Sequence, residues 1–205
     1  LEMHSRLAQA KRTRVADDFR DGSNLIMFSS DVSARGMDYP DVTAVVQVGM
    51  PSDKAQYIHR LGRTGRAGKA GGGYLLLAEE ERPFLGMVTD LPLATRAPLG
   101  SEQAAAVGAA FTEAMTRVSA EIKASCYQAW LGFYNTFTKR LGWSKPEVVR
   151  RANLFASVVL GLDSPPPIEA RTAAKMGLSG VQGLVYGTGV PKSGGGGKGG
   201  GGKGG

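Results

Sequence analysis

Cysteine is almost absent from this sequence, and long apolar runs are missing altogether. The single cysteine, Cys126, excludes an internal disulfide framework and a cysteine-based zinc site. Because Cys126 falls in an apolar helical pattern, we expect it to be buried. No apolar run approaches the length of a membrane-spanning helix, and the N-terminal residues lack the charged start and apolar block of a secretory signal. We therefore expect no membrane partner.

Positive charge is in excess, but only in the second part of the chain. Residues 1–90 contain 12 Lys and Arg against 12 Asp and Glu, whereas residues 91–190 contain 10 against 6. Residues 191–205 add 3 lysines and no acid, which completes the net charge of +7. A neutral part followed by a basic extension favours an anionic polymer as partner, with salt-sensitive binding. Acidic lipid would give the same signal, but no lipidation motif supports it.

Short apolar runs alternate with helical patterns over residues 1–90. Residues 24–28, 43–48 and 73–77 are typical of strands, and we expect the first two to be buried on both faces. Residues 2–4 are expected to end an earlier strand. The alternation predicts an α/β domain with a parallel sheet. In such sheets a ligand binds beyond the carboxyl ends of the strands.

Two helices are expected between these strands, each with its own start or stop signal. Apolar residues at helical spacing run from Leu7 to Phe19, and Gly22 is expected to stop this helix in a left-handed conformation. Ser52 is expected to cap a second helix that reaches about Leu61, with Asp53 at its positive end. An acidic run at residues 79–81 marks a third helix start.

An arginine-rich and glycine-rich stretch follows the second helix. It reads His59-Arg60-Leu61-Gly62-Arg63-Thr64-Gly65-Arg66-Ala67-Gly68. A guanidinium group can bind phosphate oxygens through two parallel hydrogen bonds, and the three glycines permit positive φ angles and close approach to a ligand. The alternative is a solvated basic turn.

Polar residues also follow the strand expected at residues 24–28. The loop reads Ser29-Ser30-Asp31-Val32-Ser33-Ala34-Arg35-Gly36-Met37-Asp38. Its hydroxyl and amide groups could hold phosphate oxygens. Asp31 and Asp38 could fix the loop or accept a hydrogen bond from a sugar hydroxyl. By itself, this loop could equally be an ordinary turn.

Three ordered motifs resemble those of the DEAD-box RNA helicases. They are Gln9-x-x-Arg12, Ser30-Asp31-x-x-x-Arg35-Gly36-x-Asp38, and His59-Arg60-x-Gly62-Arg63-x-x-Arg66. The match covers roughly residues 1–90 and corresponds to the second of the family's two RecA-like domains. The family usually has Thr where Ser30 stands, so the hydroxyl is kept. The resemblance implies a RecA-like helicase C-terminal domain of the P-loop NTPase type, incomplete at its N-terminus.

The resemblance also implies a role for each matched residue. Arg63 and Arg66 correspond to arginine fingers that reach the γ-phosphate of ATP. Asp38 corresponds to the carboxylate on the ribose, and His59 and Arg60 correspond to residues that link the ATP site to the domain interface. The residues that correspond to contacts with the RNA backbone are Gln9, Arg12, Ser30, Arg35 and Gly36. His4 matches no motif and is expected to be structural.

Two motifs that ATP hydrolysis needs are missing. There is no G-x-x-x-x-G-K-[ST] phosphate loop and no Asp-Glu-Ala-Asp sequence for magnesium. We expect the chain, which does not begin with methionine, to be a fragment that is inactive alone. The resemblance implies a missing N-terminal RecA-like domain that holds ATP and Mg²⁺. No metal site is expected in the chain itself.

Residues 91–185 are expected to form a helical extension of about three helices. Apolar residues step by three or four from Ala104 to Leu141, and Ser144 has capping-box spacing to Glu147 with a proline between them. The aromatic residues could stack on RNA bases, but a packed apolar stripe is the favoured interpretation for three of them. These aromatic residues are Tyr127, Trp130, Phe133, Tyr134 and Phe137. The basic residues at the same junction could contact RNA or form a solvated face. They are Lys139, Arg140, Lys145, Arg150 and Arg151.

The end of the extension is rich in proline, and the tail is rich in glycine and lysine. Residues 163–168 form a stiff extended connector, and residues 186–205 are expected to be a disordered tail that is native or an engineered linker. The extension resembles those of fungal mitochondrial DEAD-box RNA chaperones, which assist the splicing of structured introns. That resemblance implies the mitochondrial matrix; otherwise the nucleus or cytoplasm is expected.

Three functions remain open at this point. The first is the C-terminal part of an ATP-dependent RNA helicase or RNA chaperone that contacts the RNA backbone without reading sequence. The second is a non-catalytic RNA-binding adaptor that keeps a helicase-like fold. The third is a DNA-directed helicase, which is disfavoured because the motif residues resemble those of RNA helicases.

Overall fold

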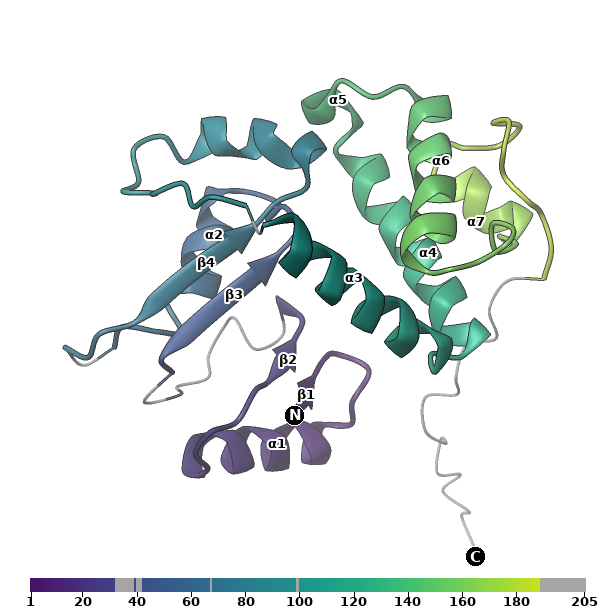
Figure 1. The fold of residues 1–205 in the computed structure, drawn as a ribbon. Helices are drawn as coiled ribbons and strands as arrows, with labels where there is room; N and C mark the ends of the chain where they lie inside the picture. Colours follow the sequence, from purple (N-terminus) through teal and green to yellow (C-terminus); the bar gives the residue numbers. More distant parts are fainter. Residues whose placement is uncertain (32–38, 40–41, 67, 99, 189–205) are drawn as a thin grey trace, which may run out of the picture. The chain divides into compact units, whose positions relative to one another are not determined.

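The computed structural model describes residues 1–31, 39, 42–66, 68–98 and 100–188 (Figure 1). The chain divides into two compact units, Leu1–Leu93 and Ala94–Gly205, which are described separately. In the described residues, no helix is both long and apolar enough to cross a membrane.

The first unit consists of two parallel strand pairs, each joined by a helix. Strands β1 (Glu2–Met3) and β2 (Phe28–Ser29) pair in parallel, with α1 (Gln9–Asp21) between them in sequence. Strands β3 (Ala44–Val48) and β4 (Gly72–Leu76) pair in parallel along their whole length, with α2 (Lys54–Leu61) between them. A 3₁₀-helix, η2 (Glu79–Met87), follows β4. The predicted α/β organisation with parallel pairing is confirmed.

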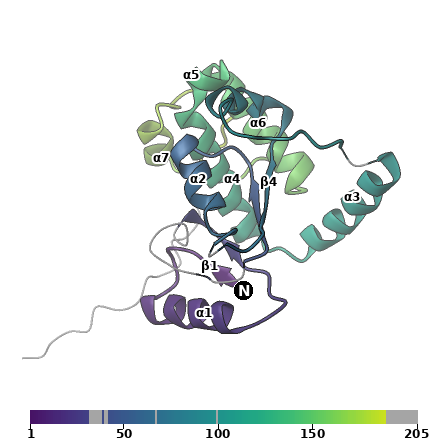
Figure 2. The same cartoon turned by 90° about the vertical axis from the view of Figure 1, so that its left-hand side faces the viewer.

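One core cluster of the first unit lies between α1 and β1, which are neighbours in both views (Figures 1 and 2). Its buried residues are Met3, Val15, Ala16 and Tyr39, with Phe19, Met27 and Val42 packed against them. The rings of Phe19 and Tyr39 meet edge to face with centroids 5.4 Å apart. Apolar residues at helical spacing in α1 therefore face the core, as predicted.

The burial predicted for the strands is wrong. The side chains of Ile26 and Phe28 are 72% and 76% exposed, and only Phe28 and Ser29 pair as a strand. Val46 and Val48 of β3 are also largely exposed. A sheet of two strands leaves side chains uncovered on faces where no described element packs, so an apolar run alone does not ensure burial.

Two predicted helix ends differ in detail from the structure. Gly22 ends α1 with extended backbone angles (φ −89°, ψ 170°) instead of a left-handed turn. Glycine is still required there, because a Cβ would lie 2.7 Å from the carbonyl oxygen of Asp18. The N-cap of α2 is Asp53 and not Ser52, since the Asp53 carboxylate accepts a hydrogen bond from the Gln56 amide at 2.7 Å.

The second unit is helical, as predicted. It contains α3 (Ser101–Thr116), α4 (Ala120–Thr136), α5 (Thr138–Leu141), α6 (Lys145–Leu154), the π-helix η3 (Phe155–Val159) and α7 (Ala170–Lys175). Ser144 caps α6 by accepting a hydrogen bond from the Glu147 amide, and proline occupies the first turn. The core is formed mainly by α4, α6 and the segment after η3, with Tyr127, Leu131, Val148 and Leu178 fully buried.

Cys126 is exposed, so the prediction that it is buried is wrong. The next residue in α4, Tyr127, is fully buried instead. Neighbouring positions on a helix differ by about 100° in direction, so a shift of one residue separates the core from solvent. The Tyr127 hydroxyl donates a hydrogen bond to Asn153 at 2.7 Å, and burial raises the pKa of Tyr127 to about 12.

A segment whose two ends pair with each other follows the prolines of the second unit. Ile168 and Tyr186 form an isolated parallel bridge, with hydrogen bonds from Ile168 to Val185 at 2.8 Å and from Gly187 to Ile168 at 3.2 Å. The segment between them contains α7 and the buried Leu178. Tyr186 therefore belongs to the structured extension and not to the tail, for which residues 186–205 were predicted.

Candidate functional site

The arginine-rich stretch begins in α2 and continues into the loop before β4. Of its glycines, Gly65 and Gly68 have φ angles of +67° and +75°, as expected, whereas Gly62 has a φ of −65°. Close approach is required at Gly71, where a Cβ would lie 2.1 Å from the Thr64 hydroxyl. The Thr64 hydroxyl also donates a hydrogen bond to the Val42 carbonyl, which ties the loop to the start of β3. The loop thus has a defined path past the strands.

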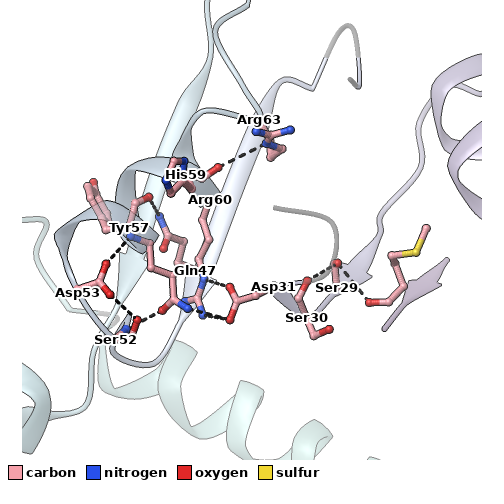
Figure 3. Close-up of polar contacts among 12 residues, drawn as sticks. Ser29, Ser30, Asp31, Gln47, Ser52, Asp53, Tyr57, His59, Arg60 and Arg63 are labelled. Atoms are coloured by element: carbon pink, nitrogen blue, oxygen red, sulfur yellow. Dashed lines mark hydrogen bonds and ion pairs between the residues drawn. The ribbon is translucent and has the colours of Figure 1, made fainter. Parts of the chain in front are cut away.

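The chain's own carbonyl groups orient both predicted arginine fingers. The Arg63 Nε donates a hydrogen bond to the His59 carbonyl at 3.4 Å (Figure 3). The Arg66 Nε donates to the Gly62 carbonyl at 2.7 Å. These acceptors lie at the C-terminal end of α2, where carbonyl groups lack partners within the helix. Each guanidinium group is therefore held by the carbonyl of the residue four positions earlier.

Arg63 and Arg66 both line a cavity of about 80 Å³. Its lining residues come from the segment before β3 and from the loop before β4. They are Tyr39, Val42, Thr43, Arg63, Gly65, Arg66, Lys69 and Ala70. Burial raises the pKa of Tyr39, and the positive charge of Arg63 opposes part of that rise. Positive charge at a built cavity is suited to an anionic group such as phosphate.

Arg60 and Asp31 fix the end of β2 against α2. The Arg60 guanidinium donates two hydrogen bonds to the Asp31 carboxylate, at 2.6 and 3.0 Å (Figure 3). Gln56 donates a third, at 3.0 Å, and its own carbonyl oxygen accepts from the Ser52 amide at 2.6 Å. Asp31 therefore anchors the end of β2 to α2, whereas the rest of the loop that it was predicted to fix lies outside the described residues.

Only part of the predicted RNA-contacting set lies in the described residues. Gln9 and Arg12 are on the first turn of α1, and Ser30 is exposed directly after β2. The Arg12 Nε is buried and has no hydrogen-bond partner in the described part of the chain. Ser30 is placed by its amide, which donates to the Met3 carbonyl at 3.0 Å. Arg35, Gly36 and Asp38 lie outside the described residues.

The two histidines have different environments. His59 is exposed on α2, and its carbonyl holds Arg63. The Nδ1 of His4 accepts a hydrogen bond from the Arg6 amide at 3.2 Å, which agrees with the structural role expected for His4. Of the two histidines, His59 is the one that contacts Arg63.

Several residues that support the site were not predicted from the sequence. Glu81 is 2% exposed, and its carboxylate accepts from the Met50 amide at 2.7 Å and the Ala78 amide at 2.8 Å. Gln47, a buried polar residue in β3, donates to the Tyr57 carbonyl at 3.2 Å. A polar residue inside an apolar strand was a signal for Gln47. The acidic run at the helix start was a local signal for the contact of Glu81 with the Ala78 amide, but not for its contact with Met50.

The aromatic residues of the second unit mostly contact one another. Trp130 stacks with Phe155 at 5.5 Å and lies 4.2 Å from Tyr134, measured between ring centroids. Trp130 and Trp143 both pack against the core, which supports the packing interpretation for Trp130. The fully buried Tyr127 has no face exposed for a base. Stacking of Phe133, Tyr134 or Phe137 on RNA stays a prediction.

The basic residues beside these aromatics also have partners within the unit. Glu147 pairs with Arg150 at 2.8 Å and with Arg151 at 2.5 Å, and these hydrogen bonds hold the pKa of Glu147 at about 2. The Arg151 guanidinium also lies 4.6 Å from the centre of the Trp143 ring. Lys145 donates to Asn135 at 2.7 Å. Part of the positive charge at this junction is therefore neutralised by Glu147.

Comparison with known proteins gives consistent matches for both units. Residues 1–68 match the family described as the helicase conserved C-terminal domain. The DEAD-box ATP-dependent RNA helicase 31 of Arabidopsis thaliana is 51% identical over 183 residues, which cover 89% of this chain and 25% of the relative. The chain spans between 21% and 33% of the length of the curated relatives compared with it.

Solved structures of the helicase Mss116p share the fold. Domain 2 of Mss116p bound to an RNA duplex has a TM-score of 0.69 at 29% identity, covering 91% of this chain and 74% of that one. Mss116p bound to single-stranded RNA and AMP-PNP has a TM-score of 0.70, also at 29% identity, covering 90% of this chain and 37% of that one. The predicted RecA-like fold is confirmed. The chain therefore carries the C-terminal RecA-like domain of a DEAD-box helicase, followed by a helical extension.

Proposed function

We propose that this chain is the C-terminal part of an ATP-dependent RNA helicase. It supplies Arg63 and Arg66 to the γ-phosphate of ATP held by an upstream RecA-like domain, and it contacts the RNA backbone through α1 and the loop after β2. The observation that carries the proposal is the cavity that both backbone-oriented arginines line.

The arginines act by electrostatic stabilisation. Negative charge spreads over the γ-phosphoryl oxygens in the transition state, and a positioned guanidinium group is worth about 10³–10⁵ in rate. Because carbonyl groups already orient both side chains, less conformational freedom is lost when the phosphate arrives. The Arg60–Asp31 pair holds α2, whose C-terminal end leads to Arg63, against the strand that precedes the loop proposed to contact RNA.

Residues of two domains would contact the nucleotide. We assign ATP and Mg²⁺ to the upstream domain, as the family resemblance implies. In the described ranges of this chain, no three His, Cys, Asp or Glu side chains gather as a metal site. Mg²⁺ would supply charge neutralisation at the β- and γ-phosphates, and the residues of this chain would orient the γ-phosphate from the other side.

The test is RNA-stimulated ATP hydrolysis by the chain joined to its upstream half. Arg63→Ala and Arg66→Ala should each lower kcat by about 10³ or more. Arg82→Ala is the matched control, because Arg82 pairs with Glu79 on an exposed turn of η2. Near-normal turnover in both finger variants would contradict the proposal. RNA binding without any ATP hydrolysis by the joined wild type would favour the non-catalytic adaptor.

We further propose that the protein remodels structured RNA as a chaperone in mitochondria. Support comes from the likeness to Mss116p, which extends over 91% of the chain and so includes the helical extension. Splicing of structured introns is the predicted process. A fluorescent fusion of the whole coding sequence tests the compartment, and signal confined to the nucleus or cytosol would contradict it.

A further inference from the structure

Lys69 lines the same cavity as the two arginine fingers. It lies outside the three motifs that identify the site. Its backbone amide donates to the Arg66 carbonyl at 3.0 Å, so Lys69 and Arg66 are held in one turn. Gly68, between them, has the positive φ angle of +75° that this turn needs. The position of Lys69 at the cavity is therefore built into the loop.

The lining of the cavity is suited to an anion. Arg63, Arg66 and Lys69 place three cationic residues along its lining. Tyr39, which is only 2% exposed, and Val42 provide an apolar wall that lowers the local dielectric constant and strengthens charge interactions.

The cavity has room for a group larger than water. Its volume is about 80 Å³, whereas about 10–15 Å³ measured in this way holds one water molecule. A tetrahedral phosphoryl group has several oxygens, and a lysine ammonium can bind one of them while each guanidinium binds others.

We infer that Lys69 is a third phosphate-binding residue, which holds the terminal phosphate of the nucleotide together with Arg63 and Arg66. The inference rests on the proposed function for the identity of the ligand. It adds a residue that the helicase motifs do not contain, and it implies that the chain alone has a weak affinity for pyrophosphate.

The first experiment uses the 205-residue chain with sodium pyrophosphate as the probe, at low ionic strength. Binding is measured by isothermal titration calorimetry and by the amide NMR shifts of Gly65 and Lys69. Lys69→Ala should weaken binding about tenfold, which is about 1.4 kcal/mol. Lys69→Arg keeps the charge and should bind nearly as the wild type does.

Lys54→Ala is the matched control, because it also removes one lysine from the first unit. Lys54 is the first residue of α2 and pairs with Asp90. This variant should bind pyrophosphate as the wild type does. Absence of saturable binding by the wild type would overturn the inference, and so would equal binding by Lys69→Ala. An equal loss in the Lys54 variant would show a general charge effect and would also overturn it.

The second experiment separates this inference from the proposed function. In the chain joined to its upstream half, Lys69→Ala should raise the KM for ATP about tenfold, while its affinity for a single-stranded RNA stays unchanged. If Lys69→Ala weakens RNA binding and leaves KM unchanged, Lys69 belongs to the RNA interface and the inference fails. If Lys69 matters for pyrophosphate but the joined protein hydrolyses no ATP, the cavity stands and the proposed function fails.

Discussion

We expect the buried carboxylate of Glu81 to contribute strongly to the stability of the first unit. Its two oxygens accept from the Met50 amide at 2.7 Å and the Ala78 amide at 2.8 Å, and its side chain is 2% exposed. Met50 lies in the buried loop that leads from β3 to α2, and Ala78 is exposed at the start of η2. Glu81 thereby joins the segments that follow the two paired strands.

Replacement of Glu81 with alanine leaves two amides without an acceptor. The Met50 amide is buried, so losing its partner costs about 1–3 kcal/mol, whereas water can replace the partner of the exposed Ala78 amide at little cost. We expect Glu81→Ala to lower the free energy of unfolding of the first unit by about 2–3 kcal/mol. Glu81→Gln keeps one acceptor oxygen, so a loss of about 1–2 kcal/mol is expected.

The assay is urea unfolding with two probes. Both tryptophans, Trp130 and Trp143, lie in the second unit, so tryptophan fluorescence follows that unit. Far-UV circular dichroism follows both units, and hydrogen exchange of the Met50 amide follows the loop. Glu81→Ala should move the transition of the first unit and speed exchange at Met50.

Glu79→Ala is the matched control. Glu79 lies two residues away in η2, and its surface pair with Arg82 should be worth no more than about 1 kcal/mol. The reasoning is refuted if Glu81→Ala and Glu79→Ala have the same urea midpoint and the same exchange rate at Met50.

Three further predictions concern the second unit and the tail. Tyr127→Phe removes the hydrogen bond to Asn153 and should lower the stability of the second unit by about 1 kcal/mol, measured by tryptophan fluorescence in urea; an unchanged midpoint would contradict it. Because the folded pKa of Glu147 is about 2, below its ordinary 4.5, its ion pairs stabilise the unit fully above pH 4.5 and are lost as the pH falls towards 2. Glu147→Gln should therefore flatten the acid limb of a fluorescence titration, and an identical limb would count against the pairing. Deletion of residues 189–205 removes three lysines and should lower the slope of log K against log salt for single-stranded RNA by up to about 2; an unchanged slope would exclude the tail from RNA binding.

Helices with complete local signals could be predicted from the sequence. The start of α6 is an example, because a serine cap, a proline in the first turn and a regular apolar stripe all agree. Burial was harder to predict. Cys126 and Tyr127 are adjacent, and only the packing of α4 decides which one enters the core. For residues 24–28, burial depends on which elements cover the strand, and an apolar run does not contain that information.

The candidate site shows the same division. A motif predicts a phosphate-binding role for Arg63 and Arg66, and the structure places both residues at one cavity; the role itself stays a prediction. The contacts that fix the neighbouring segments could not be predicted. Asp31 and Arg60 are 29 residues apart in the sequence, and Met50 and Glu81 are 31 residues apart. Such contacts are set by the tertiary arrangement of βαβ units, and a single sequence gives no signal for them.

The bridge between Ile168 and Tyr186 has a consequence for where the chain can be shortened. The bridge joins the two ends of the segment that contains the buried Leu178. The stability of the second unit should therefore fall abruptly, and not gradually, as the chain is shortened past the bridge. Chains that end at residue 188 keep the bridge. Chains that end before residue 185 lose it, and the segment with Leu178 is then expected to leave the core. The number of residues between the prolines and Tyr186 is therefore constrained by the fold, because a shorter segment could not form the bridge and also bury Leu178.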